Sequence, residues 1–374
     1  MHNAASSDLG DTGPWDGLLR PASARPLHSP HLAGQRVLIT GAAGSIGSAL
    51  THAVAASSPA SLILLDTSEN GLYHLDRSLH AANVHHHVPL LGSVTNQTTL
   101  DHLFHHHHPQ IIFHAAALKH VPLMEQNPFA ALDNNSLGTL TLAHAALAHR
   151  SQHLVIISTD KAVDPHSIMG ASKRIAELIF LSLATAATRM TAVRLCNVIG
   201  SQGSVLPLFR EQLAHNLPLT VTDPESHRYF IPLDRAIEAL LSALHSTSTS
   251  ALLLPEVATP IRILDLATHL LGTHPTTSSS IEFTGLRPGD KLTEHLLSPR
   301  EQVVSSTNET LRTIQTPIPT LATLHAALTT LREAIHSHDL PQLLRAIHTL
   351  VPEYQPSAAI KNSLTQYLAP ELQA

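Results

Sequence analysis

Short, near-continuous apolar runs alternate with long Ala- and Leu-rich segments, and this alternation constrains the fold more than any other feature. The apolar runs are residues 37–40, 62–65, 111–113, 154–157 and 191–193. Continuous apolar runs are typical of parallel strands that are covered on both faces. The intervening segments, such as 130–150 and 173–188, are predicted to be helices. Strand–helix alternation of this kind predicts an α/β protein with a doubly wound parallel sheet.

A glycine-rich turn directly follows the first apolar run. Gly41, Gly44 and Gly47 have the spacing G-x-x-G-x-x-G between a strand and a helix. In a Rossmann-like domain, such glycines permit a tight turn and let a pyrophosphate approach the helix N-terminus. Asp66 ends the second strand, where a carboxylate would bind the adenosine ribose and repel a 2′-phosphate. The pattern predicts an NAD site, the alternative being a strand–turn–helix unit without a ligand.

A second group of polar residues follows the fourth apolar run. Thr159, Asp160 and Lys161 come first, and Met169 and Lys173 follow on the next predicted helix. The arrangement resembles a short-chain dehydrogenase site, in which Ser or Thr precedes Tyr-x-x-x-Lys and the lysine lowers the pKa of the phenol. A thioether cannot exchange a proton, so the acid/base chemistry must fall to neighbours. Asp160 and Lys161 are the candidates, and a solvated loop pair is the alternative.

Further segments carry a more specific resemblance. They are residues 113–125, 135–139, 159–173, 193–205, 222–230 and 283–292. In this order they resemble CapD-like polysaccharide biosynthesis proteins, which are extended short-chain dehydrogenases that include UDP-N-acetylglucosamine 4,6-dehydratases. One branch of that family has Met at the tyrosine position. Many of these relatives carry N-terminal membrane helices, and this chain resembles their soluble catalytic part.

The resemblance implies an internal redox reaction on a UDP-activated amino sugar. The sugar is oxidised at carbon 4 with NAD⁺, water is eliminated across carbons 5 and 6, and the hydride returns to carbon 6. The product is a 4-keto-6-deoxy sugar. By resemblance, Asp160 protonates the leaving hydroxyl and Lys161 takes the proton from carbon 5. Thr159 would bind the 4-oxygen, Lys173 would hold the nicotinamide ribose, and Met169 would pack against the sugar or nicotinamide.

The resemblance also implies substrate and cofactor contacts. Arg228 and Arg287 would grip the diphosphate, because a guanidinium suits phosphate oxygens, while Asn197 and Lys119 would contact the substrate. Alternatively, Arg228 and Arg287 are ordinary surface arginines, and Asn197 is a buried, hydrogen-bonded residue of the core. Ser93 replaces the Asp usual near the adenine. The expected cofactor contacts are Gly41, Gly44, Ser45, Ile46, Gly47, Asp66, Ser93, Val94, Ala115, Ala116 and Lys173.

Composition excludes several classes of protein. The 28 Asp and Glu exceed the 22 Lys and Arg, which argues against a nucleic-acid binder. No apolar run approaches the roughly 20 residues of a membrane span. A lone cysteine, Cys196, suits a reducing compartment, so we expect a cytoplasmic protein. No metal site is expected from the His tracts 85–87 and 105–108, because consecutive side chains point apart.

The alternation ends near residue 200. We expect a weakly ordered segment at 1–33, an NAD-binding Rossmann domain at 34–200 to which later segments return, a smaller substrate-binding lobe at 201–318, and a helical tail at 319–374. Fold analogy predicts a homo-oligomer.

A UDP-sugar 4-epimerase or reductase is a competing function, although such enzymes rely on the missing tyrosine. A non-catalytic protein that binds NAD or a nucleotide sugar is a third.

Overall fold

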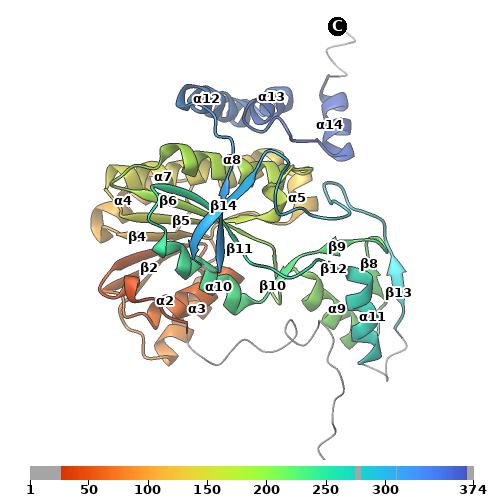
Figure 1. Ribbon diagram of the computed structural model, residues 1–374, viewed down its shortest axis with the longest axis horizontal. Helices are drawn as coiled ribbons and strands as arrows, with labels where there is room; N and C mark the ends of the chain where they lie inside the picture. Colours follow the sequence, from red (N-terminus) through yellow and green to blue (C-terminus); the bar gives the residue numbers. More distant parts are fainter. Residues whose placement is uncertain (1–26, 274–278, 309, 369–374) are drawn as a thin grey trace, which may run out of the picture.

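A computed structural model gives the structure of residues 27–273, 279–308 and 310–368 (Figure 1). Its central element is a nine-stranded sheet. In spatial order the strands are β14 (Gln302–Asn308), β15 (Leu311–Gln315), β11 (Ser250–Pro255), β6 (Arg189–Leu195), β5 (His153–Thr159), β4 (Ile111–His114), β1 (Arg36–Thr40), β2 (Ser61–Asp66) and β3 (His87–Leu91). The five strands predicted from apolar runs are all present.

The sheet has the strand order of a dinucleotide-binding fold. From β3 to β11, neighbouring strands are parallel, and at the far edge β15 runs in the opposite direction and pairs antiparallel with both β11 and β14. The order β3-β2-β1-β4-β5-β6 changes direction between β1 and β4, and ligands of open α/β sheets bind at that point. The doubly wound, Rossmann-like α/β class predicted from the sequence is confirmed.

Helices cover both faces of the sheet (Figure 1). On one face lie α4 (Gln97–His107), α7 (Gly138–Ala148) and α8 (Ile168–Leu183), and on the other α2 (Ser45–Ala55), α3 (Glu69–Ala81) and α10 (Leu233–Ser242). Strand β1 shows why two cores form. Leu38 belongs to the buried cluster on the α8 side, whereas Val37 and Ile39 belong to the cluster on the α2 side. Alternate side chains of a strand point to opposite faces.

A smaller lobe lies beside the carboxyl-terminal edge of the sheet (Figure 1). It contains α9 (Val205–Ala214), β8 (Leu219–Val221), α11 (Ile263–Gly272) and β13 (Ile281–Phe283), around a third apolar cluster that includes Phe209. Two short pairs complete this region, β7 (Asn197–Val198) with β10 (Phe230–Ile231) and β9 (His227–Arg228) with β12 (Ile261–Arg262). The segment 201–318 is therefore not continuous in space, since β11, β14 and β15 return to the main sheet.

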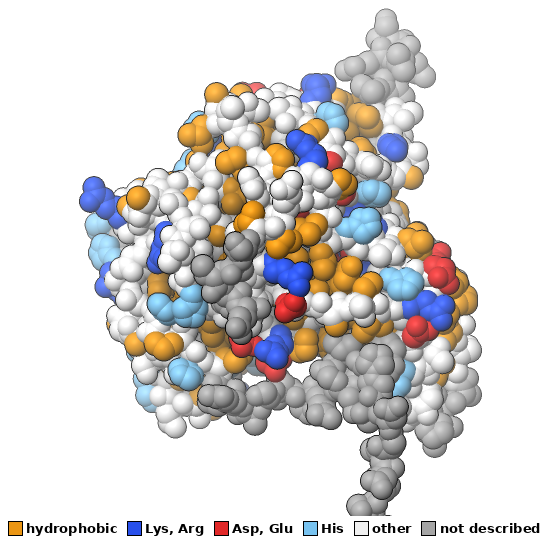
Figure 2. Space-filling model, in the orientation of Figure 1, with side chains coloured by type: hydrophobic (Ala, Val, Ile, Leu, Met, Phe, Trp, Pro, Cys, Tyr) orange, Lys and Arg blue, Asp and Glu red, His pale blue; other side chains and the backbone are white. Residues whose placement is uncertain are grey.

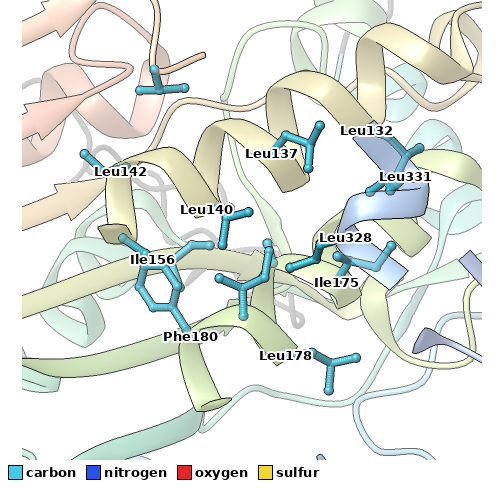
Figure 3. Packing of buried hydrophobic residues seen from close by; sticks show 14 of the residues in the cluster. Leu132, Leu137, Leu140, Leu142, Ile156, Ile175, Leu178, Phe180, Leu328 and Leu331 are labelled. Carbon is cyan, nitrogen blue, oxygen red and sulfur yellow. The ribbon is translucent and has the colours of Figure 1, made fainter. Parts of the chain in front are cut away.

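The C-terminal segment is helical and packs on the α8 layer. It forms α12 (Leu321–Ser337), α13 (Leu340–Leu350) and α14 (Ala358–Leu368). Figure 3 shows Leu328 and Leu331 of α12 in one buried cluster with Leu132 and Ile175. No helix among the described residues is long and apolar enough to cross a membrane.

At the other end, residues 1–26 of the segment expected to be weakly ordered lie outside the described residues. Within the rest of that segment, Pro30–Leu32 form a 3-10 helix whose Leu32 is fully buried, which differs from the expectation.

Candidate active site

The glycine turn between β1 and α2 is shaped by close backbone contacts. Gly41 has a φ of +68°, and a Cβ there would lie 2.5 Å from the nitrogen of Ala116. A Cβ on Gly47 would lie 2.0 Å from the carbonyl oxygen of Gly41. Both glycines are therefore required by the chain's own packing. Gly44 differs, because a Cβ added there would lie at an ordinary contact distance, 3.4 Å, from the carbonyl oxygen of Gly41. The surface of Gly44 is therefore open to a ligand at the N-terminus of α2.

Asp66 connects the glycine turn to the loop after β2. One oxygen of its carboxylate accepts a hydrogen bond from the amide of Ala43 and the other from the amide of Ser68, each at 2.9 Å. A carboxylate has about four lone-pair positions, so acceptor capacity remains for ribose hydroxyls. The Ser93 hydroxyl is hydrogen-bonded within its own turn, to the hydroxyl of Thr95 at 2.9 Å. The glycine turn and Asp66 together fit an adenine dinucleotide.

The remaining predicted cofactor contacts lie around this turn. Ala115 and Ala116 pack against Gly41, and Val94 is buried beneath Gly138 at the start of α7. Ile46 packs against the core cluster on the α2 side of the sheet.

Gln202 links a predicted cofactor residue to a predicted substrate residue. Its amide donates to the Ser45 hydroxyl at 3.0 Å, and its carbonyl accepts from the Lys119 ammonium. Burial lowers the pKa of Lys119. Nothing in the sequence indicated this link, because it joins backbone atoms of a loop more than 80 positions distant from either side chain.

A π-helix, Asp133–Leu137, interrupts the helix predicted at 130–150 near its beginning. It follows α6 (Pro128–Leu132) and runs into α7. Its Asn135 side chain pairs with both backbone polar groups of Leu118, at 2.8 and 2.9 Å, and donates to the Ser172 hydroxyl at 2.9 Å. Such π-helical turns are frequent at functional sites. Here the turn fixes the loop that carries Lys119 against α8.

The acid/base candidates form one hydrogen-bonded cluster at the end of β5. Lys161 donates to Oδ1 of Asp160 at 3.1 Å and to the amide oxygen of Asn197 at 3.2 Å. Thr159 also donates to Oδ1 of Asp160, at 2.9 Å. Asp160 is buried, and its Oδ2 has no hydrogen-bond partner. The two residues therefore do not form the solvated pair that was the alternative on sequence grounds.

Two charged residues that the sequence analysis did not assign complete this cluster. Glu294 is 3% exposed, and its Oε1 lies 4.0 Å from the ammonium of Lys161. Lys291 pairs with the other oxygen of Glu294 at 3.1 Å and donates to the carbonyl of Val163 at 2.7 Å. Both follow Asp160 by more than 130 positions, so no local pattern could have placed them there.

The charges of the cluster stabilise one another. Burial alone would lower the pKa of Lys161, but Asp160 and Glu294 outweigh it and raise this pKa above its ordinary value. Burial would likewise raise the pKa of Glu294, but Lys161, Lys291 and Arg228 outweigh it and lower this pKa. In the ligand-free protein, Lys161 is therefore an ammonium and Glu294 a carboxylate.

Lys173 lies one helical turn after Met169 on α8. Burial lowers the pKa of Lys173 to about 8, an effect that the charge of Glu177 partly offsets. Met169 is 4% exposed and belongs to the core cluster on the α8 side. Nearby, His114 lies between the hydroxyls of Thr40 and Thr139, at 2.7 and 2.9 Å. Burial and then the charge of Lys173 lower the pKa of His114 to about 3, so its imidazole is neutral.

The two predicted diphosphate ligands lie in different surroundings. The guanidinium of Arg228 donates to the backbone carbonyls of Lys291 and Leu292, at 2.8 and 2.9 Å, and so holds the segment that carries Glu294. Arg287 pairs with Asp290 at 2.8 Å, and its side chain is 58% exposed. Of the two, the structure places Arg228 in the cluster around Lys161, and Arg287 in an exposed turn.

A buried network of ion pairs centred on Glu177 of α8 holds the end of β5 in place. Glu177 accepts hydrogen bonds from Ser158 at 2.6 Å, from Arg174 at 2.9 Å and from Arg194 at 2.8 and 2.9 Å. Arg194 also pairs with both oxygens of Glu301, at 2.7 and 2.8 Å. Because Ser158 directly precedes Thr159, this network fixes the strand end on which the candidate acid/base pair is built.

The sheet order, the glycine turn, Thr159 at the end of β5 and Lys173 on α8 are those of a short-chain dehydrogenase/reductase type of protein. A comparison with protein families gives the particular family. The profile of polysaccharide biosynthesis proteins matches residues 37–316, and the chain belongs to this family.

Individual relatives agree with this assignment. The capsular polysaccharide biosynthesis protein CapD of Staphylococcus aureus is 41% identical over 74% of this chain and 47% of its own length. The chain spans about half the length of the curated relatives it matches first. The X-ray structure of Pen from Bacillus thuringiensis is 28% identical with a TM-score of 0.70, covering 77% of this chain and 89% of that one.

A more distant structure shows the fold alone. It is DesIV, a dTDP-glucose 4,6-dehydratase from Streptomyces venezuelae, solved with NAD bound. It is 22% identical with a TM-score of 0.63, covering 70% of this chain and 88% of that one.

Proposed function

We propose that this chain is an NAD-dependent nucleotide-sugar 4,6-dehydratase that acts on a UDP-activated amino sugar of the UDP-N-acetylglucosamine type. The observation that carries the proposal is the Asp160–Lys161 pair at the carboxyl end of β5, in a site with Met169 at the position of the usual tyrosine. Elimination of water needs an acid and a base side by side, and this pair supplies both. Membership of the polysaccharide biosynthesis family supports a product destined for a glycan.

The charge state of the pair sets the order of proton transfers. Lys161 begins as an ammonium, so it must lose its proton before it can act as a base. Oδ1 of Asp160 lies 3.1 Å from this ammonium and can accept the proton directly. Binding of the sugar removes water from the cluster, and desolvation favours the neutral pair over the ion pair. The amine then takes the proton from carbon 5, while the Asp160 carboxyl protonates the leaving hydroxyl, which restores the original charges.

Other residues would hold the reactants in place. NAD, when bound, supplies the hydride acceptor and donor of this chemistry. Gly44 and Asp66 would bind its pyrophosphate and adenosine ribose, and Lys173 its nicotinamide ribose. On substrate binding, the Thr159 hydroxyl would turn its hydrogen bond from Asp160 to the 4-oxygen of the sugar, and Asn197 would keep Lys161 oriented through their 3.2 Å contact. Arg228, Arg287 and Lys119 supply positive charge for the diphosphate.

Product analysis tests the proposal directly. The full chain is incubated with UDP-N-acetylglucosamine in D₂O and the reaction is followed by NMR. We expect a 4-keto-6-deoxy sugar, with a new methyl signal and deuterium at carbon 5. An epimer would instead support the competing 4-epimerase function, and unchanged sugar would support a non-catalytic role. The Asp160→Asn variant is the control for a contaminating activity.

The cofactor prediction can be checked without substrate. We expect the purified protein to retain NAD, because a cofactor that is regenerated in each turnover has no need to leave. Mass spectrometry of the denatured protein should detect NAD, and Asp66→Ala should lower the amount retained. Release of NADP by the wild-type chain would overturn the role given to Asp66.

Replacing Met169 by Tyr should not improve catalysis. The Met169 side chain is buried in the core cluster, where a phenol has a different shape and needs a hydrogen-bond partner. We expect lower turnover for Met169→Tyr, whereas Met169→Leu, which nearly conserves volume, should keep most of it. A tenfold gain with Tyr, about 1.4 kcal/mol of barrier, would show instead that this chain is a damaged tyrosine enzyme.

A further inference from the structure

Three side chains of types that can bind metal ions meet at the edge of the sheet, away from the candidate active site. Asp76 and His80 lie one turn apart on α3, and His87 is the first residue of β3. Oδ1 of Asp76 lies 2.9 Å from Nε2 of His87 and 3.7 Å from Nε2 of His80. Within the described ranges, this is the one group of three such residues whose ligand atoms all lie within 4.8 Å of one another.

We propose that Asp76, His80 and His87 bind a zinc ion. Tetrahedral zinc with bond lengths near 2.0–2.1 Å places neighbouring ligand atoms about 3.3 Å apart. The two separations from Asp76 Oδ1, 2.9 and 3.7 Å, bracket that value, so only small side-chain movements are needed. Two imidazoles and a carboxylate suit zinc. Three protein ligands leave a fourth coordination position for water. His85 is a further imidazole near this group, because its ring centroid lies 5.7 Å from that of His80.

Burial distinguishes this group from histidines that merely lie on the surface. The His87 side chain is 2% exposed and that of Asp76 is 31% exposed, so two of the ligands are held by packing and by their mutual hydrogen bond. The His80 side chain is 56% exposed, which leaves a path by which the ion can enter. Figure 2 shows histidine side chains at several separate places on the visible face.

The position in the fold indicates what the ion would do. β3 is parallel to β2 and β1, and His87 pairs with Leu62 near the amino end of β2. The glycine turn follows the opposite, carboxyl end of β1. Zinc would therefore join the second half of α3 to the edge strand β3 without touching the dinucleotide site. We expect it to stabilise this edge of the sheet.

A zinc titration of the untagged, metal-stripped full chain tests the proposal. We expect calorimetry with zinc chloride to show one ion per chain that binds at least tenfold more tightly than any others. Zinc should also raise the melting temperature, because a ligand that binds only the folded state stabilises it. His87→Gln should abolish the tight event and the thermal shift. His80→Gln, an exposed change that leaves the fold intact, should weaken binding at least tenfold.

The matched control uses two histidines four positions apart on a helix, which is the spacing of Asp76 and His80. His102 and His106 lie one turn apart on α4, with ring centroids 4.0 Å apart, but they do not belong to the three-ligand group. The double variant His102→Gln, His106→Gln should keep the tight zinc event. Equal titrations for the wild type and His80→Gln, or loss of the tight event in the control alone, would overturn the proposal.

Discussion

Asp160→Asn and Lys161→Ala should each abolish measurable product formation from UDP-N-acetylglucosamine. Removing a general acid or base typically costs about 10²–10⁴ in rate. The loss should lie near the upper end of this range, because Asp160 and Lys161 contact each other directly and each variant disables the proton transfer between them. The measurement is the initial rate of the 4-keto product. Retained NAD and a cooperative thermal unfolding transition show that the fold is intact.

The matched control for these variants is Lys361→Ala, an exposed lysine on α14. It removes the same charge as Lys161→Ala without touching the cluster and should leave the rate unchanged. Near-normal turnover in either Asp160→Asn or Lys161→Ala would mean that Glu294 or another group carries the proton, and the assignment of the pair would fail.

Arg194→Leu should cause the largest loss of stability of any single change that we consider. Arg194 is 1% exposed, and its removal leaves the buried Glu177 and Glu301 with Arg174 as their one remaining cationic partner among the described residues. Breaking a buried ion pair from one side costs about 3–5 kcal/mol. The midpoint of urea unfolding at neutral pH measures the effect. The control, Arg235→Leu, removes an exposed pair with Glu238 and should cost no more than about 1 kcal/mol.

The pH dependence of this loss follows from Glu177. Burial would raise its pKa, but Arg194, Arg174 and the Ser158 hydrogen bond outweigh burial and lower the pKa to about 2. A carboxyl whose folded pKa is depressed stabilises the fold above its ordinary pKa, and this contribution is lost as the pH falls towards the folded value. The difference between wild type and Arg194→Leu should therefore narrow as the pH falls from 4.5 towards 2. A constant difference over that range would mean that Arg194 stabilises the fold by packing alone.

The elements that the sequence predicted are those whose patterns are local. The five buried strands are apolar runs in sequence order, and the glycine turn is a short motif between a strand and a helix. Strand β3 was missed because His87 and Pro89 interrupt its apolar character, and only pairing with β2 makes it a strand. The helix predicted at 130–150 contains a π-helical turn, whose hydrogen bonds depend on contacts with α8 and the Leu118 loop.

For the site, the sequence by itself determined the identities of Thr159, Asp160, Lys161 and Lys173, with the first three at the end of β5 and Lys173 on α8. A strand end and the first turn of the next helix lie close together whatever the rest of the chain does. The tertiary structure alone decided the environment of these residues. Glu294 reaches Lys161 from a distant loop, and its charge adds to that of Asp160 in raising the pKa of Lys161. The meeting of Asp76, His80 and His87 likewise depends on how α3 packs against β3. Spacing along the chain fixes which groups are available, but pKa values and ligand geometry depend on distances and burial, which exist only once the chain has folded.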